Sequence, residues 1–496
     1  MNATKSRHQF TINRNHLSLK GLYSVMKSHY LVLLCIILSS VASAQQLDFP
    51  IAATSNSAEL SKAMPILAKN VMANYKEDDR KKFLSNLFRL QIVAGEYANA
   101  NATIKAYRQE NEASNYSEVA YIQYEIFALA KLRQLTTANS FEQAFEEVFN
   151  DIYGKLSDKV AYHTSTAFLT RAGIGVHQNR LQQLLDKQKD KDSISLSDAL
   201  VLCRAYNLFE VYKTIEPLAI PLLSEEDEKR YIIQDDVLIK TRDGATISAL
   251  VVRKKGISEP QATALLFNIY TNENANLRLA IQAVPYGYIG VVADTRGKRL
   301  SPDDIVPYEY EAKDVNAVID WISKQSWSDG RVAMYGGSYS GFAQWAATKY
   351  IHPALKTIVP YVAAIPGQGL PMENNIFLNA NYGWAFYVTN NKYLDNEVYF
   401  NQKRWNELNN NWYQSGKSYR EIDKVDGTPN PLLQRWLDHP AYDEYWQSMV
   451  PYKDDYKNIN IPVLSITGYY DDAQISALHY LNEHYKYNKN VEHYLL

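Results

Sequence analysis

The chain has 496 residues, of which 46% are hydrophobic, and its 52 basic and 54 acidic side chains give a formal net charge of −2. This length predicts more than one domain, or one domain with large insertions, and the apolar content is ordinary for a globular protein with a large core. The balanced charge gives no reason to expect nucleic acid or an anionic membrane surface as a partner.

The N-terminus has the pattern of a secretory leader. A basic region that ends at Lys27 precedes an apolar run, which closes with a small-x-small triplet at 42–44. We therefore expect a signal peptide over residues 1–44, cleaved near Ala44, and a secreted or periplasmic protein; Met26 is an alternative start of translation. An uncleaved membrane anchor is the competing reading. The apolar run is short for a membrane span, so we expect no stable anchor.

Cysteine usage limits the kinds of site that the chain can build. Cys35 lies in the leader, which leaves Cys203 as the single cysteine of the mature protein. A disulfide framework and a cysteine metal site are therefore excluded. No HExxH motif or clustered His/Asp spacing is present either, and we expect no metal and no cofactor.

Residues 45–225 show helical periodicity. A clear apolar stripe follows Ser140, which forms a capping box with Gln143. We predict an all-α domain over this range, without a convincing fixed-period repeat. Its lone histidines, His163 and His177, are interpreted as surface or core residues and not as catalytic groups.

The charged run at 224–230 marks the predicted boundary of a second domain, residues 226–496. Two β-type runs flank Asp243 and Gly244, which is a hairpin signal, and strands then alternate with helices. This order predicts a doubly wound α/β sheet. The alternation of strands and helices is interrupted between about 366 and 455. Five of the eight tryptophans lie in this segment: Trp384, Trp405, Trp412, Trp436 and Trp446. We predict a helical, aromatic-rich cap over the carboxyl ends of the strands; the alternative is that these aromatics form the cap's own core.

A serine stands at the sharpest predicted turn of this sheet. The stretch 331–347 reads as a buried strand, then GGSYSG, then a helix, with Ser338 at the apex and the small residues Gly336 and Ser340 on either side. A tight strand–turn–helix exposes a serine hydroxyl and aims the first N–H groups of the helix at a negative charge that develops beside it. The match to G-x-S-x-G is imperfect, because glycine follows one residue late, at Gly341. The other interpretation is that this turn only connects the strand to the helix and has no catalytic role.

From about residue 235 onward, the chain resembles the cocaine-esterase-like and X-prolyl dipeptidyl-peptidase family of serine hydrolases. That family has a G-x-S-Y-x-G elbow, which residues 336–341 match. The segment at 310–336 is similar to the family's lead into the elbow, and those at 351–363 and 437–471 are similar to its segments after the elbow and before the acid. The resemblance implies an α/β-hydrolase fold with a cap, and it does not cover the helical N-terminal half.

The resemblance also implies roles for single residues. Ser338 would be the nucleophile, and the backbone N–H of Tyr339 would be one donor of the oxyanion hole. The second donor would be the hydroxyl of Tyr270, although Ile269 stands where the family usually has proline.

The same resemblance implies which residue is the acid of the catalytic triad and which charged loop is structural. Asp471 would be the acid that orients the catalytic histidine, with Asp472 as the neighbouring alternative. Asp294 and Arg296 match the family's arginine–glycine loop and are expected to be structural. Arg299 stands in this loop where glycine is usual.

No histidine of the chain fits the remaining catalytic role. The chain order in this fold is Ser, Asp, His, which restricts the choice to His479 and His484 in the helix after the acid and His493 in the last core strand. The family histidine follows that strand, so we expect it after Leu496, together with a C-terminal domain. His439 precedes the acid and is interpreted as structural. We therefore predict that the 496 residues alone are inactive or nearly so.

The favoured function is an exported serine hydrolase that cleaves ester or amide bonds through an acyl-enzyme. Two subclasses stay open, an acyl esterase or acylase and an Xaa-Pro dipeptidyl-peptidase, and the expected partner is a small ester, amide or short peptide substrate. The alternative is a non-catalytic binding or scaffold protein that uses the helical domain while the hydrolase fold is idle. The sequence predicts no oligomeric state.

Overall fold

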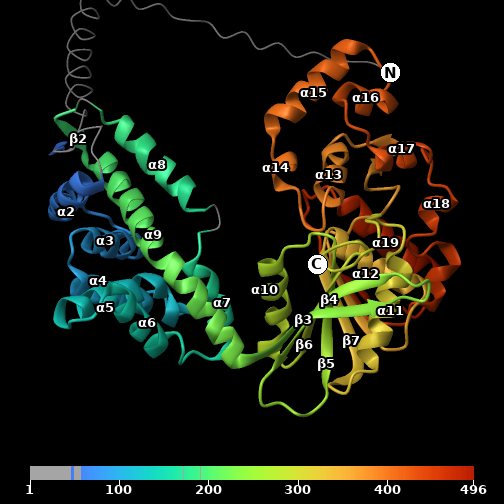
Figure 1. Ribbon diagram of the computed structural model, residues 1–496, viewed down its shortest axis with the longest axis horizontal. Helices are drawn as coiled ribbons and strands as arrows, with labels where there is room; N and C mark the ends of the chain where they lie inside the picture. The colour runs from blue at the N-terminus through green and yellow to red at the C-terminus, as the bar shows by residue number, and fades with distance from the viewer. Residues whose placement is uncertain (1–45, 50–56, 171–172, 190) are drawn as a thin grey trace, which may run out of the picture. The chain divides into compact units, whose positions relative to one another are not determined.

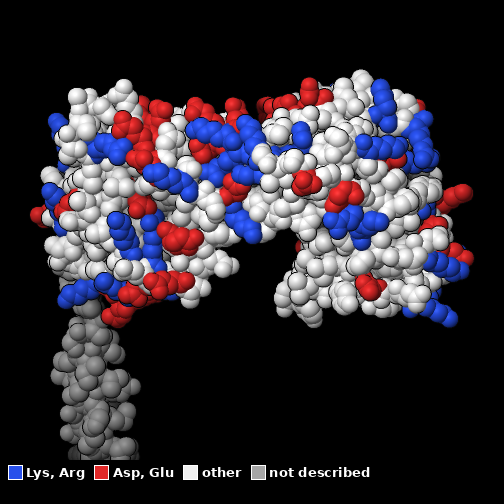
Figure 2. Space-filling model, turned by 90° about the horizontal axis from the view of Figure 1, so that it is seen from below, with Lys and Arg blue, Asp and Glu red and all other residues white. Residues whose placement is uncertain are grey.

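The computed structural model describes residues 46–49, 57–170, 173–189 and 191–496 (Figure 1). The predicted leader lies outside the described residues. Within them, no helix is both long enough and apolar enough to cross a membrane. Basic and acidic side chains are intermixed on the face shown in Figure 2, in keeping with the balanced charge of the sequence.

Two compact units divide the chain. The first contains the described residues up to Asp151 together with Ala167–Ala219, and the second contains Ile152–Thr166 and Ile220–Leu496. The charged run expected to separate domains instead forms the last turns of α9 (Leu196–Arg230). It stays helical because its charges pair along the helix: Glu226 contacts both Lys229 and Arg230.

The first unit is helical, with one short strand pair that the sequence did not predict. Its helices are α2 (Ser57–Asn74), α3 (Arg80–Val93), α4 (Tyr97–Gln109), α5 (Ile122–Thr136), α6 (Phe141–Ile152), α8 (Ile174–Asp186) and the first part of α9, with 3₁₀ turns at Ser117–Val119 and Thr166–Phe168. Strands β1 (Gln46–Asp48) and β2 (Ser193–Ser195) pair antiparallel. The predicted capping box of α6 is confirmed: the N–H of Ser140 donates to Gln143 Oε1 at 3.1 Å, and the N–H of Gln143 donates to Ser140 Oγ at 3.3 Å.

One mixed eight-stranded sheet forms the framework of the second unit. Its strands are β3 (Tyr231–Lys240), β4 (Thr246–Lys254), β5 (Gln261–Asn268), β6 (Ile289–Asp294), β7 (Ser328–Gly337), β8 (Leu355–Tyr361), β11 (Val463–Ser465) and β12 (His493–Leu495). Their order is β12-β11-β8-β7-β5-β6-β4-β3; β4 runs antiparallel to its two neighbours and the other pairs are parallel. The predicted α/β sheet and its opening hairpin are confirmed.

Helices cover both faces of this sheet (Figure 1). They are α10 (Glu273–Ala283), α11 (Glu311–Ser323), α12 (Tyr339–Lys349) and α19 (Gln474–Tyr487). The unit also contains α7 (Asp158–Ser165) and 3₁₀ turns at Val284–Tyr286 and Lys453–Asn458. Alternate residues of a strand point to opposite faces. Accordingly, Leu250 and Val252 of β4 pack with α10, whereas Val251 belongs to the larger core that includes α11 and α12.

The segment between β8 and β11 forms the cap. It contains β9 (Met372–Glu373), β10 (Ile376–Phe377), α13 (Ala380–Thr389), α14 (Asn396–Tyr399), α15 (Gln402–Ser415), α16 (Ile422–Asp426), α17 (Pro431–Leu437) and α18 (Glu444–Gln447), with a 3₁₀ turn at Tyr419–Glu421. Trp405 and Trp412 pack against a small core of the cap itself. Trp384, Trp436 and Trp446 instead join the large core that also contains sheet residues. The aromatic residues therefore serve both as the cap's own core and as its packing against the sheet.

Candidate active site

Ser338 occupies a strained turn between β7 and α12. Its backbone has φ 57° and ψ −119°, a positive φ that a residue with a side chain rarely adopts. The turn is also crowded: a Cβ on Gly336 would come 2.6 Å from Ser340 Cβ, and one on Gly341 would come 2.8 Å from Ala363 Cα. The small residues of GGSYSG are therefore required by the close approach of the chain. Such strain is typical of functional sites. It therefore favours a turn that exposes Ser338 to a substrate over a turn that only connects strand and helix.

Tyr339 opens α12, directly after the serine. The first N–H groups of a helix have no partner inside the helix, so the N–H of Tyr339 is available to an anion at the turn. Its side chain is buried on the other side, where the hydroxyl donates to Glu311 Oε1 and accepts from the N–H of Tyr308 at 3.0 Å. The Tyr339 side chain thus anchors the backbone that carries this N–H.

Tyr270 follows β5 at the same edge of the sheet. Its hydroxyl accepts from the indole N–H of Trp384 at 3.3 Å, and the Ser338 side chain is close enough to affect the pKa of this hydroxyl. Asn268 fixes the backbone of Tyr270: its Oδ1 accepts from the Tyr270 N–H at 3.0 Å, and its Nδ2 donates to the Tyr270 carbonyl at 3.1 Å. Burial raises the pKa of Tyr270, against the opposing effect of the Trp384 and Ser338 side chains, so the phenol stays protonated and able to donate.

Asp471 lies in the turn that leads from β11 into α19. Because β11 runs parallel to β8, and β8 to β7, this turn is at the same edge of the sheet as Ser338. The Asp471 carboxylate accepts from the N–H of Ala473 at 2.8 Å. Asp471 and Asp472 are both exposed in this turn, and the structure records no hydrogen bond from either carboxylate to Ser338.

Three of the four histidines considered for the catalytic role are hydrogen bonded to other groups. His493 bonds Ser465 Oγ at 2.8 Å, and burial lowers its pKa to about 3. His484 bonds the carbonyl of Ile459 at 3.2 Å. His439 Nδ1 bonds an oxygen of Asp443 at 2.7 Å. His479 is partly buried on α19, and burial lowers its pKa.

The arginine loop after β6 is built as a structural network. Arg296 binds Asp314 with two nitrogens, at 2.6 and 2.9 Å, and reaches Asp243 of the hairpin turn at 3.0 Å. Arg299 has φ 53°, a backbone region that favours glycine.

Lys298 of the same loop is fully buried beneath the cap. Its ammonium donates to three backbone carbonyls at the end of α13, among them Val388 at 2.8 Å and Asn391 at 3.2 Å. Burial lowers its pKa to about 8. Nearby, Asp294 accepts hydrogen bonds from Thr271 and Asn276, both at 2.9 Å, and burial raises its pKa to about 6.

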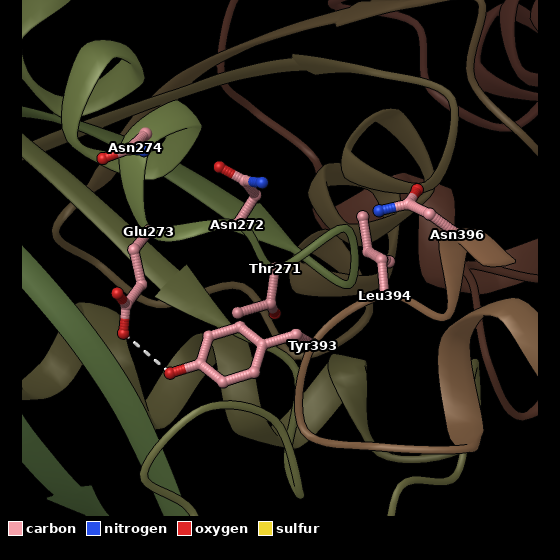
Figure 3. Close-up of a pocket in the computed structure, with 7 residues that line it drawn as sticks. All are labelled: Thr271, Asn272, Glu273, Asn274, Tyr393, Leu394 and Asn396. Carbon is pink, nitrogen blue, oxygen red and sulfur yellow. Dashed lines mark hydrogen bonds between the residues drawn. The ribbon is translucent and has the colours of Figure 1, made fainter. Parts of the chain in front are cut away.

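A pocket of about 360 Å³ opens at Thr271, the residue that follows Tyr270 in the chain (Figure 3). It is lined by Thr271, Asn272, Glu273, Asn274, Tyr393, Leu394 and Asn396. The Tyr393 hydroxyl donates to Glu273 Oε1 at 2.7 Å, which joins the two walls. The lining is polar and contains one carboxylate and no basic side chain. Within the described residues, no group of three or more His, Cys, Asp or Glu side chains is arranged to hold a metal ion.

Three residues of the site were missed by the sequence analysis. The sequence pattern could have identified Glu311, because this residue lies three to four positions before Asp314 and Val315 and therefore on the same, buried face of α11. A carboxylate at such a position indicates a buried polar contact. Trp384 was treated only as one of the cap aromatics, and Lys298 only as part of a loop. Their partners are about 90 to 114 residues away in sequence, so no local pattern identifies the contacts.

The similarity to known proteins lies in the part of the chain that carries the eight-stranded sheet. Residues 228–495 match the X-Pro dipeptidyl-peptidase (S15) family. Cocaine esterase from Rhodococcus sp. (strain MB1 Bresler) is 26% identical over 270 residues, which are 49% of this chain and 44% of that protein. The chain therefore spans less than half the length of this curated relative.

Solved structures give partial matches of the same extent. An α-amino acid ester hydrolase aligns with TM-score 0.41 and 24% identity, covering 54% of this chain and 47% of that chain. An aminopeptidase from a marine sediment Thaumarchaeota archaeon aligns with TM-score 0.40 and 21% identity, covering 50% and 46%.

The family assignment rests on the sequence match together with the sheet. The matched residues make up more than half of the chain and include all eight strands of the large sheet. The chain belongs to the X-Pro dipeptidyl-peptidase (S15) family of hydrolases, with an α/β-hydrolase fold and similarity to cocaine esterase.

Proposed function

We propose that the chain carries the nucleophile and the oxyanion hole of a serine hydrolase that cleaves ester or amide bonds through an acyl-enzyme. The observation that supports this most directly is the strained turn at Ser338 with the Tyr270 hydroxyl against it. A structural turn needs neither the positive φ at a serine nor a buried phenol beside it.

In the proposed reaction, Ser338 Oγ bonds to the substrate's carbonyl carbon while its proton passes to a general base. The carbonyl π electrons move to the oxygen, where the N–H of Tyr339 and the hydroxyl of Tyr270 stabilise the negative charge. Collapse of this intermediate breaks the C–O or C–N bond, and the leaving group takes the proton from the base. Water then attacks the acyl-enzyme by the same route and releases the acid and Ser338.

The base remains the histidine expected after β12, with Asp471 as the acid that orients it. The histidines that follow the acid support this proposal. His484 and His493 are buried and hydrogen bonded to other groups. His479 lies on α19, and burial lowers its pKa. We accordingly propose that residues 1–496 alone are nearly inactive, with a loss on the order of a millionfold relative to the complete triad.

The test compares p-nitrophenyl acetate hydrolysis by the native gene product and three variants. Ser338→Ala is expected to abolish turnover, and Tyr270→Phe to lower kcat by ~10²–10³, the usual effect of losing one oxyanion donor. Ser340→Ala, which keeps the Cβ that packs at Gly336, is the matched control and should retain activity. Full turnover by Ser338→Ala would overturn the proposed function.

The 496-residue chain is measured in parallel. Ordinary turnover by this chain, abolished by Ser338→Ala, would contradict the proposed position of the base. A panel of Xaa-Pro anilides and short acyl esters then separates a dipeptidyl-peptidase from an esterase, since the preferred substrate has the higher kcat/KM. Export through the predicted leader is proposed on sequence grounds, and N-terminal sequencing of the secreted protein tests it.

A further inference from the structure

The cap supplies a hydrogen bond to the tyrosine of the proposed oxyanion hole. Trp384 lies on α13, 114 residues after Tyr270 in the chain, and its indole N–H donates to the Tyr270 hydroxyl at 3.3 Å. Trp384 is only 8% exposed. Water therefore has little access to this indole as a competing partner.

This contact restricts where the Tyr270 proton can point. An indole nitrogen only donates, whereas a phenol has one proton to donate and lone pairs that accept. Since the Tyr270 oxygen accepts from Trp384, its own proton is directed away from the indole. The Ser338 side chain also acts on this hydroxyl, so the proton is free to point toward an oxyanion formed at the serine.

The same contact affects the strength of the hydrogen bond that Tyr270 donates. When a phenol donates to an anion, negative charge builds on its oxygen, and a hydrogen bond received by that oxygen stabilises this charge. The gain is larger in a buried site than in water. The Trp384 indole is thus placed to strengthen Tyr270 as a donor when the oxyanion forms.

Packing holds the Trp384 ring in this position. It stacks on Tyr308, with ring centroids 5.7 Å apart and an interplanar angle of 26°. Tyr308 in turn donates its backbone N–H to the hydroxyl of Tyr339. One aromatic cluster therefore fixes the surroundings of both proposed oxyanion donors.

We propose that Trp384 is a positioning residue of the hydrolase reaction, which orients the Tyr270 hydroxyl toward the oxyanion and thereby couples the placement of the cap to the rate of acylation. This inference rests on the proposed function, and Trp384 itself touches no reacting atom.

The kinetic test is a double-mutant cycle on p-nitrophenyl acetate hydrolysis by the native gene product. Trp384→Phe keeps a stacking ring and removes the N–H, and it should lower kcat about tenfold with KM changed less than twofold. In a Tyr270→Phe background the same substitution should change kcat less than twofold, because the hydroxyl that it orients is gone. Trp436→Phe is the matched control, since Trp436 packs in the same cluster and donates no hydrogen bond to Tyr270; it should leave kcat within about twofold.

A second measurement is independent of turnover. The eight tryptophans give a small set of ¹⁵N-indole resonances, and the Trp384 signal is assigned by its loss in Trp384→Phe. Tyr270→Phe should shift this signal, and an unchanged signal would overturn the contact.

The outcomes separate this inference from the function on which it rests. Equal losses for Trp384→Phe in both backgrounds, or an equal loss for Trp436→Phe, would overturn the positioning role while Ser338-dependent turnover persists. Turnover that survives Ser338→Ala would overturn the proposed function and this role with it.

Discussion

Glu311 gives the second unit a pH-dependent stability that a single substitution should remove. Its carboxyl is 1% exposed, and its Oε1 accepts from the Tyr339 hydroxyl, while Oε2 has no hydrogen-bond partner among the described residues. Burial raises its pKa to about 8, and the nearby Asp314 carboxylate acts in the same direction. The folded protein therefore keeps this carboxyl protonated at pH values where the unfolded chain has lost the proton.

The sign and size follow from proton linkage. Between the unfolded value of 4.5 and the folded value of about 8, the native state binds one more proton than the unfolded state. The free energy of unfolding must then fall as pH rises, by about 1.4 kcal/mol per pH unit and by roughly 5 kcal/mol over the whole interval. Below pH 4.5 this contribution is fully present, and above pH 8 it is lost. Glu311→Gln has no proton to lose, so its stability relative to the parent should rise with pH across this window.

The assay is urea unfolding followed by tryptophan fluorescence at pH 5, 6, 7 and 8. All eight tryptophans lie at or after Trp321, so the signal reports the second unit alone. Glu259→Gln, which removes an exposed carboxyl from the turn between β4 and β5, is the control and should follow the parent. A constant difference between Glu311→Gln and the parent from pH 5 to pH 8 would refute the reasoning, because a shifted carboxyl cannot leave the two profiles parallel.

Two further predictions concern the packing around the site. Arg296→Leu leaves Asp314, itself 1% exposed, without its partner, and should lower the free energy of unfolding by about 3–5 kcal/mol in the same assay. Arg331→Leu, which removes an exposed partner, should leave the urea midpoint nearly unchanged, and equal midpoints for the two variants would contradict the role of the buried pair. Gly290→Ala would place a Cβ 1.8 Å from the carbonyl oxygen of Ala280, so β6 and α10 must separate; we expect a loss of about 1–3 kcal/mol or more, and an unchanged midpoint would show that the helix shifts freely.

The sequence predicted the sheet because its strands are short apolar runs punctuated by turns, and a buried parallel strand needs only that pattern. It also predicted the turn at Ser338, since small residues at this spacing between a strand and a helix are typical of a tight turn. It did not show that the charged run at 224–230 continues a helix, because the pairing of Glu226 with Arg230 exists only once that helix has formed. The contact of Trp384 with Tyr270 was out of reach, because it depends on how the cap folds back onto the sheet.

Val362 links the proposed nucleophile to the strand that leads to the proposed acid. This β-branched residue has φ 42°, a true backbone outlier, and it lies next to the equally strained Ser338. Its carbonyl accepts from the Ser338 N–H at 3.2 Å, and its own N–H donates to the carbonyl of Ile466 at 2.8 Å, just after β11. Two strained residues, each costing of order 1–3 kcal/mol, are thus retained where the chain must hold the turn after β7 against the turn after β11, as expected if Ser338 and Asp471 act in one reaction.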